Sequence, residues 1–168
     1  MVLTKSELIA SLQHEVHILL HLAGKLEPAM FDYRPTPKQR SALELLKYMT
    51  IMGPSLVDAA RRGGFDPAIW MAAEQEATAR DLASTLAAIA AQKEGYARQL
   101  ADWTDEDFRA EIDMFGTKTT RGQFLVNLVL GGCAAYRTQL FLYLKACGRE
   151  ELNTMNLWAG IDPPVAAA

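Results

Sequence analysis

The chain has 168 residues, of which 50% are apolar and 22% are charged, and its formal net charge is −3. This composition is typical of a globular domain and argues against an intrinsically disordered chain. It also argues against a nucleic-acid-binding surface, because phosphate recognition requires clustered Lys and Arg. We expect a single domain over residues 1–168, with residues from about 160 onward, ending in "PPVAAA", as a loose C-terminal tail.

Neither a signal peptide nor a membrane span is expected. Lys5 and Glu7 interrupt the first apolar segment, and the longest apolar run, 124–136, is too short to cross a bilayer. Cys133 and Cys147 fall in one predicted helix, roughly 21 Å apart along its axis, so they cannot pair within the chain. Two unpaired cysteines fit a reducing compartment. The sequence therefore predicts a soluble, cytoplasmic protein without a membrane partner.

Four segments carry the 3.6-residue period of amphipathic helices, and no segment carries a strand pattern. Two of them open with a capping box, formed by Thr4 with Glu7 and by Ser41 with Glu44. Pro54 falls inside the second helix and is expected to kink it. The predicted helices cover about 4–26, 41–63, 78–103 and 120–148.

The connections between the helices carry less regular signals. "FDPAIW" is expected to form a short extra turn, with Asp66 as its cap and Pro67 in its first position. "TDEDFRAEID", residues 104–113, is interpreted as a capped short helix rather than as a pair of catalytic acids. The connection from Gly63 to Ala77 is long enough to cross a bundle. An all-α four-helix bundle is predicted, and both up-and-down winding and an overhand crossover fit it.

All three histidines occur in "HEVHILLH", at His14, His17 and His21. At about 100° per residue they lie opposite the apolar stripe of the first helix, which predicts a face turned to solvent or to a partner subunit. His14 and His21 are roughly 10.5 Å apart along the axis, so one metal ion cannot bind all three. A polar helix face is the favoured interpretation. Pairing across a dimer and a two-histidine metal clip at His17 and His21 are the alternatives.

Two stretches carry a family resemblance: "RPTPKQRSALELLKYM", residues 34–49, and "GCAAYRTQLFLYLKACG", residues 132–148. Together they resemble the DinB-like superfamily, the YfiT-like four-helix bundles regarded as metalloenzymes. The resemblance covers nearly the whole chain. It implies a four-helix bundle with a long crossover between the second and third helices, and it suggests a homodimer.

The resemblance also implies where a metal would bind. The family's ligands are a histidine closing an "S-x-x-E-L-L-x-H" segment and two histidines of an "H-x-x-x-H-R-x-Q" segment. Those positions are Tyr48, Gly132 and Tyr136 in this sequence. Glycine offers no ligand, and a neutral tyrosine is a poor one for a nickel- or zinc-type site. We therefore expect no metal and no other cofactor at these positions.

The replaced positions suggest two arrangements. In one, both phenols and the glycine pack the interior closed. In the other, Gly132 leaves a gap roofed by Tyr48 and Tyr136, forming a small-molecule pocket with Gln139 as a polar anchor. Trp70 and Trp158 are candidate lids for one end of the bundle, or packing residues.

The remaining residues offer no catalytic constellation. No Ser-His-Asp arrangement can be built in the interior, since every histidine lies on the outer face of the first helix. The two cysteines are interpreted as inert, because no basic neighbour is evident. The sequence thus predicts a DinB-like protein without the family metal, which binds a small molecule or is structural. The alternative is a metal- or thiol-dependent transferase or hydrolase with other ligands.

Overall fold

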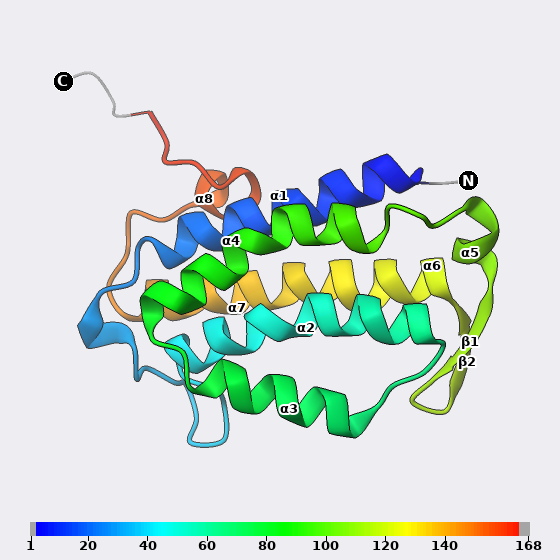
Figure 1. Cartoon of the computed structure of the whole chain (residues 1–168). Coiled ribbons are helices and arrows are strands. Elements are labelled where there is room, and N and C mark those ends of the chain that lie inside the picture. Colours follow the sequence, from blue (N-terminus) through cyan, green and yellow to red (C-terminus); the bar gives the residue numbers. More distant parts are fainter. Residues whose placement is uncertain (1–2, 165–168) are drawn as a thin grey trace.

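The computed structural model describes residues 3–164 and is mostly helical (Figure 1). Its long helices are α1 (Lys5–Ala23), α2 (Ala42–Arg62), α4 (Leu82–Gln99) and one continuous helix formed by α6 (Arg121–Phe124), a π-helical segment (Leu125–Leu130) and α7 (Gly131–Ala146). The shorter elements are a 3₁₀ turn (Pro28–Met30), α3 (Pro67–Thr78), α5 (Asp105–Arg109), strands β1 (Glu111–Met114) and β2 (Thr117–Thr120), and α8 (Thr154–Ala159).

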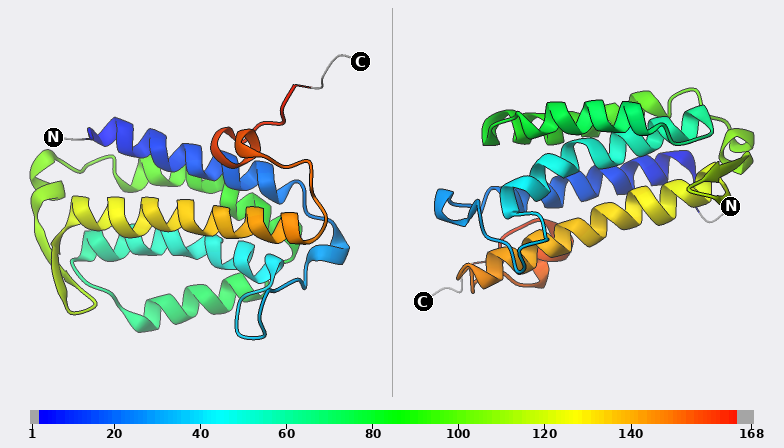
Figure 2. Two further views of the ribbon diagram at one scale, coloured as in Figure 1. Left: turned by 180° about the vertical axis from the view of Figure 1, so that it is seen from behind. Right: turned by 90° about the horizontal axis from the view of Figure 1, so that it is seen from below.

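The four long helices form the predicted bundle. Both α1 and α2 pack against α4 and α7, so α1 and α2 occupy opposite corners (Figures 1 and 2). The long connection between α2 and α4 contains α3, which lies along the outside of α2. The all-α fold class and its long connection are therefore confirmed. The core contains Leu12, Leu22, Leu45, Leu46, Ile89, Leu100, Leu125, Leu140 and Leu144, all fully buried.

The helix starts follow the capping signals closely. Thr4 and Ser41 both form complete capping boxes, and Gly63 ends α2 in the left-handed conformation at φ 83°. The third long helix differs from the prediction, because Thr78 closes α3 and Asp81 caps α4, accepting from the Ser84 N–H at 2.8 Å. The alanine-rich segment after Pro67 continues the expected short turn into a 12-residue helix, because alanine favours helix strongly.

A β-hairpin contradicts the expectation that the chain has no strands. β1 pairs antiparallel with β2, in a register that places Met114 opposite Thr117. Phe115 and Gly116 form a two-residue turn with φ values of 56° and 77°, the left-handed pair that fits the twist of a hairpin. Ile112 and Met114 are buried, which gives β1 the alternation of a half-buried strand.

Pro54 removes one backbone hydrogen bond from α2 inside the bundle. Without an N–H, it leaves the Thr50 carbonyl lacking its usual helical donor. The buried Gln92 side chain on α4 supplies one: its Nε2 donates to the Met49 oxygen at 2.8 Å and to the Thr50 oxygen at 3.2 Å. Its Oε1 in turn accepts from the Tyr96 hydroxyl at 3.2 Å. This buried network explains why α4 must pack closely on α2.

The chain's own C-terminal helix packs on part of the histidine face of α1, where His21 is half-buried while His14 and His17 stay exposed, as predicted. His14 Nε2 lies 3.1 Å from the Trp158 oxygen, and His21 Nε2 lies 3.0 Å from Asn156 Nδ2. Gly160, at φ 65°, packs directly against His17, where a Cβ would lie 2.9 Å from the ring. Ile18, next to His17 in the sequence, is fully buried. Part of this face is therefore occupied by the chain itself.

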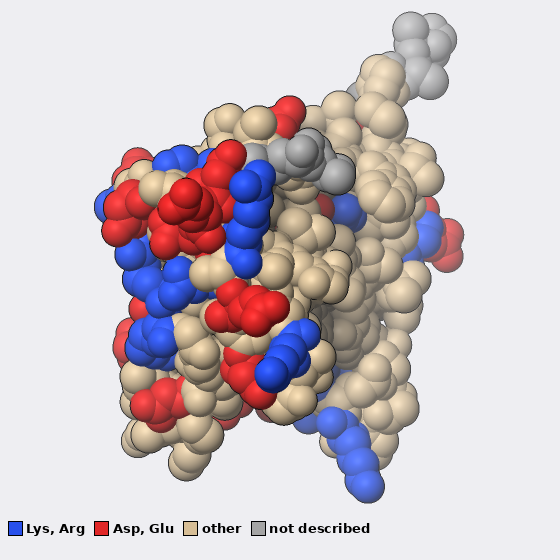
Figure 3. Space-filling model, turned by 90° about the vertical axis from the view of Figure 1, so that its right-hand side faces the viewer, with Lys and Arg blue, Asp and Glu red and all other residues tan. Residues whose placement is uncertain are grey.

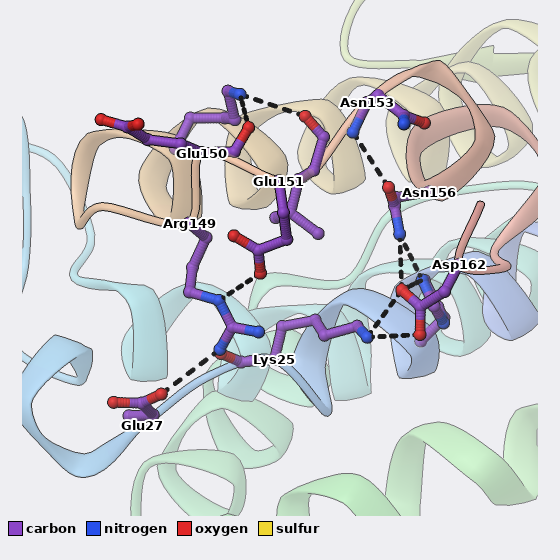
Figure 4. Close-up of polar contacts among 11 residues, drawn as sticks. Lys25, Glu27, Arg149, Glu150, Glu151, Asn153, Asn156 and Asp162 are labelled. Atoms are coloured by element: carbon purple, nitrogen blue, oxygen red, sulfur yellow. Dashed lines mark hydrogen bonds and ion pairs between the residues drawn. The ribbon is translucent and has the colours of Figure 1, made fainter. Parts of the chain in front are cut away.

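Polar contacts hold the segment around α8 in place (Figure 4). Lys25 donates to both Asp162 oxygens, at 2.7 and 2.6 Å, and Asn156 donates to Asp162 at 2.9 Å. Arg149 donates to Glu151 at 2.7 Å and lies 3.4 Å from Glu27. Residues 160–164 of the expected tail thus include an anchored carboxylate, and 165–168 lie outside the described residues.

By length and hydropathy, the continuous helix Arg121–Ala146 could cross a membrane. In the structure it is a bundle helix, because Leu125, Val129 and Leu140 are buried in the core shared with α1 and α2. Its other side, with Val126, Leu128 and Leu142, is exposed.

Candidate functional site: an aromatic groove between α2 and α7

The structure brings three of the four predicted pocket residues together. Tyr48 from α2 and Gly132 and Tyr136 from α7 line one groove of about 550 Å³. Tyr48 and Tyr136 are each half-buried, and their rings meet edge to face with centroids 5.1 Å apart. The complete lining is Tyr48, Met52, Leu56, Phe65, Trp70, Phe115, Asn127, Leu128, Gly131, Gly132, Ala135 and Tyr136.

Five aromatic rings from separate parts of the chain follow one another along this groove. Ring centroids are 5.1 Å apart from Tyr136 to Tyr48, 6.0 Å from Tyr48 to Trp70, and 5.6 Å from Trp70 to Phe65. Phe65 then lies 4.9 Å from Phe115 at the tip of the hairpin. We call these five residues the aromatic row. Their tilted and edge-to-face angles are those that aromatic quadrupoles favour.

The π-helical segment forms one wall of the groove through Asn127 and Leu128. A π-helical turn is wider than an α-helical one, so it changes the direction of every side chain that follows it. In this way it contributes to directing Gly132 and Tyr136 toward α2. Such segments occur frequently at functional sites.

Gly132 packs closely against α2. A Cβ at this position would lie 3.2 Å from the Met52 methyl carbon and 3.4 Å from its sulfur. Met52 is itself buried, one turn beyond Tyr48 on the same face of α2. The thioether of Met52 therefore fills the space in front of the position where the family carries a ligand.

The chemistry of Tyr48 does not suit metal binding either. Burial raises the pKa of Tyr48 above its usual value of 10.0, and the adjacent Tyr136 hydroxyl raises it further. The Arg40 guanidinium lies over the Tyr48 ring, 3.9 Å from its centroid. A neutral phenol is a weak ligand, and within residues 3–164 no three His, Cys, Asp or Glu side chains are grouped to hold a metal ion. The residues at the family position do not fit the family's metal.

Gln139 lies apart from the groove. Its side chain donates to the Tyr143 hydroxyl, which donates to the Arg40 carbonyl at 3.1 Å. It lines a separate hollow with Lys38, Gln39, Arg40 and Leu45. The expected polar anchor is therefore absent from the described groove, and Asn127 is the carboxamide that lines it.

Sequence reasoning found part of the aromatic row. Trp70, a candidate lid or packing residue, lies in it, whereas Trp158 packs against Arg137, 5.0 Å from ring centroid to guanidinium carbon. Phe65 and Phe115 were missed. The signal for Phe115 was the alternation of "EIDM" followed by "FG", a two-residue turn that would have placed an aromatic side chain at a hairpin tip.

The fold has a counterpart among solved structures. The crystal structure of a DinB-like protein, YjoA from Bacillus subtilis, is similar over 87% of this chain and 95% of that chain, with a TM-score of 0.65 and 20% sequence identity. No protein-family model and no curated protein matches the sequence. The chain therefore has the DinB-like fold, as its resemblance implied.

Proposed function

We propose that this protein binds a small organic molecule in the groove between α2 and α7, without using the metal of DinB-like enzymes. The observation that carries the proposal is the aromatic row: five rings from separate parts of the chain converge on one groove of about 550 Å³. Small-molecule sites usually occupy about 300–1,000 Å³ and are lined mainly by apolar and aromatic side chains with a few polar groups. Tyr48, Tyr136 and Asn127 supply those polar groups.

The lining favours binding over catalysis. It contains no His, Cys, Asp, Glu, Lys or Arg side chain, so it offers no group suited to general acid–base or nucleophilic chemistry near neutral pH. The Tyr48 phenol is held protonated by its raised pKa. A metal- or thiol-dependent transferase or hydrolase would need ligands or a thiol at this position.

Binding can be tested by blocking the groove. Ala135 is exposed and lines it, so Ala135→Trp should fill the groove without disturbing the core. Ala146, exposed near the end of the same helix and outside the lining, gives the matched control Ala146→Trp. Calorimetric titration with naphthalene-2-methanol should show binding to the native protein and Ala146→Trp but not to Ala135→Trp. Equal binding to all three proteins would contradict the proposal.

Metal content separates the proposal from the enzyme alternative. The purified, tag-free protein should carry only substoichiometric metal after incubation with nickel or zinc and desalting, measured by elemental mass spectrometry. A stoichiometric metal that survives desalting, and is lost in Tyr136→Phe, would place metal chemistry at this groove and overturn the metal-free assignment.

We also propose that the protein is a cytoplasmic homodimer. From Gly122 to Leu144 the only charged residue is Arg137, which is buried, so the outer face of this helix is uncharged. Figure 3 looks at one end of the molecule. Most charged side chains lie on the left of this view, and the right is largely uncharged. Leu142, which is 58% exposed, is a suitable probe: Leu142→Lys should yield monomers in light scattering after gel filtration, whereas Met71→Lys on α3 should not. A monomeric native protein would contradict this assignment.

A further inference from the structure

We infer that the groove selects an uncharged, planar aromatic molecule and that Phe115 at the hairpin tip is a specificity-determining wall of this site. The inference rests on the proposed small-molecule function and narrows it to a ligand class. Two independent features carry it: the backbone of Phe115 and the distribution of charge around the aromatic row.

Phe115 is held in an unfavourable position. Its φ of 56° lies in the left-handed region, which bulky side chains avoid, and the first position of this turn type is usually Asn, Asp or Gly. The residue is 61% exposed, so it contributes little to the core. Unfavourable backbone conformations of this kind cluster at ligand-binding sites. The ring does have a partner in the groove, Phe65 at 4.9 Å, which places it at one end of the aromatic row.

The charge around the groove argues against an ionic ligand. No charged side chain lines it, so a bound anion would lose its hydration without gaining an ion pair. A cation could in principle bind to the aromatic faces. However, Arg40 already lies 3.9 Å from the Tyr48 ring centroid, so it takes up the cation–π interaction of that ring, and it balances the charge of Glu74 in the neighbouring hollow. Arg40 itself lines the neighbouring hollows rather than this groove.

The polar groups that remain suit a neutral partner. The Tyr48 and Tyr136 hydroxyls can each donate or accept one hydrogen bond, and the Asn127 amide can do both. A flat ring can pack against the tilted rings of the aromatic row in the offset or edge-to-face geometry that aromatics favour. An aromatic alcohol, phenol or ketone combines these requirements.

The test uses three probes that share one ring system. Naphthalene-2-methanol is neutral, 2-naphthoate is an anion and 2-naphthylmethylammonium is a cation near neutral pH. We expect the native protein to bind the neutral probe at least about tenfold more tightly than either ion, because each ion must be desolvated without a partner. Phe115→Asn should lower the affinity for the neutral probe about two- to tenfold, since one aromatic contact is lost.

Phe115→Asn also separates binding from folding. Asparagine tolerates the left-handed conformation, so the variant should melt at the same temperature as the native protein or higher. Phe115→Tyr should retain the affinity, and Met71→Ala, which removes a 66% exposed side chain outside the groove, should have no effect.

The outcomes are distinct. If either ion binds more tightly than the neutral probe, and Ala135→Trp abolishes that binding, the proposed ligand class is wrong but the proposed binding site stands. An unchanged affinity in Phe115→Asn would remove Phe115 from the site. If none of the three probes binds, or if Ala135→Trp does not reduce their binding, the proposed function itself is overturned.

Discussion

Arg137 on α7 and Glu15 on α1 form an ion pair inside the bundle, with only 4% and 11% of their side chains exposed. The guanidinium contacts both carboxylate oxygens, Nη2 donating to Oε1 at 3.3 Å. It also donates to the Leu157 carbonyl and lies 5.0 Å from the Trp158 ring centroid. One buried side chain therefore connects α7 to α1 and to the C-terminal helix that packs beside the histidines.

Removing one partner of this pair should destabilise the protein strongly. Arg137→Met leaves the Glu15 carboxylate buried without a counter-charge, which typically costs about 3–5 kcal/mol of unfolding free energy. The double variant Glu15→Gln with Arg137→Met should recover part of that loss, because no unpaired charge remains. Urea unfolding followed by circular dichroism measures both. A loss below about 1 kcal/mol in the single variant would mean that the pair is hydrated like a surface ion pair.

Gly53 should tolerate no side chain, because Tyr96 of α4 passes directly over it. A Cβ at this position would overlap the Tyr96 hydroxyl oxygen and lie 3.1 Å from the ring carbon that bears it. Tyr96 is fully buried and hydrogen-bonded to Gln92, so its ring cannot move away freely. Gly53→Ala should therefore cost about 1–3 kcal/mol. Adding Tyr96→Phe should relieve part of this overlap, whereas in the native background Tyr96→Phe alone should destabilise by loss of the hydrogen bond.

The bundle could be predicted because its signals are local. Capping boxes at Thr4 and Ser41, the glycine pair at 63–64 and the 3.6-residue period are all properties of short segments. The hairpin was missed because its two strands have four residues each and only β1 alternates clearly in burial. The covering of α1 by α8 was missed for a different reason: it depends on Arg137, His14 and Asn156, which are far apart in the sequence.

The groove was predictable only in part. Tyr48, Gly132 and Tyr136 could be aligned on helix faces, since two helices of known phase bring them together. Phe65 and Phe115 lie on a loop and a hairpin tip, and no helix period determines where such residues point. Gln139 was misplaced although its helix was correct, because the Tyr143 hydroxyl holds its side chain in the neighbouring hollow.

Acidification should loosen the cover over α1 through His21. Its pKa is lowered from 6.5 chiefly by burial, with Lys25 and His17 lowering it further and Asp162, 3.7 Å away, acting in the opposite direction. Because the folded-state pKa is below the unfolded one, His21 contributes stability that is fully present above about pH 6.5 and is lost as the pH falls through the folded-state value.

The melting temperature should therefore decline between about pH 7.5 and about pH 5.5, and His21→Gln should show a smaller decline. His14→Gln, on the same helix face and not among the groups that shift His21, is the matched control and should retain the native pH dependence. Identical pH profiles for the native protein and His21→Gln would exclude His21 as the responsible group.

The two thiols should differ sharply in reactivity. Burial raises the pKa of Cys133 to about 12, with the Glu15 carboxylate raising it and the Tyr96 hydroxyl lowering it in part. Cys147 is only half-buried, and burial raises its pKa as well. Since the thiolate is the reactive form and must be accessible, an aromatic disulfide reagent near neutral pH should modify Cys147 slowly and Cys133 only after unfolding. Cys147→Ser should then show no reaction until denaturant is added, whereas Cys133→Ser should keep the slow native phase. Rapid native-state labelling of Cys133 would show that the interior between α4 and α7 opens far more readily than its packing indicates.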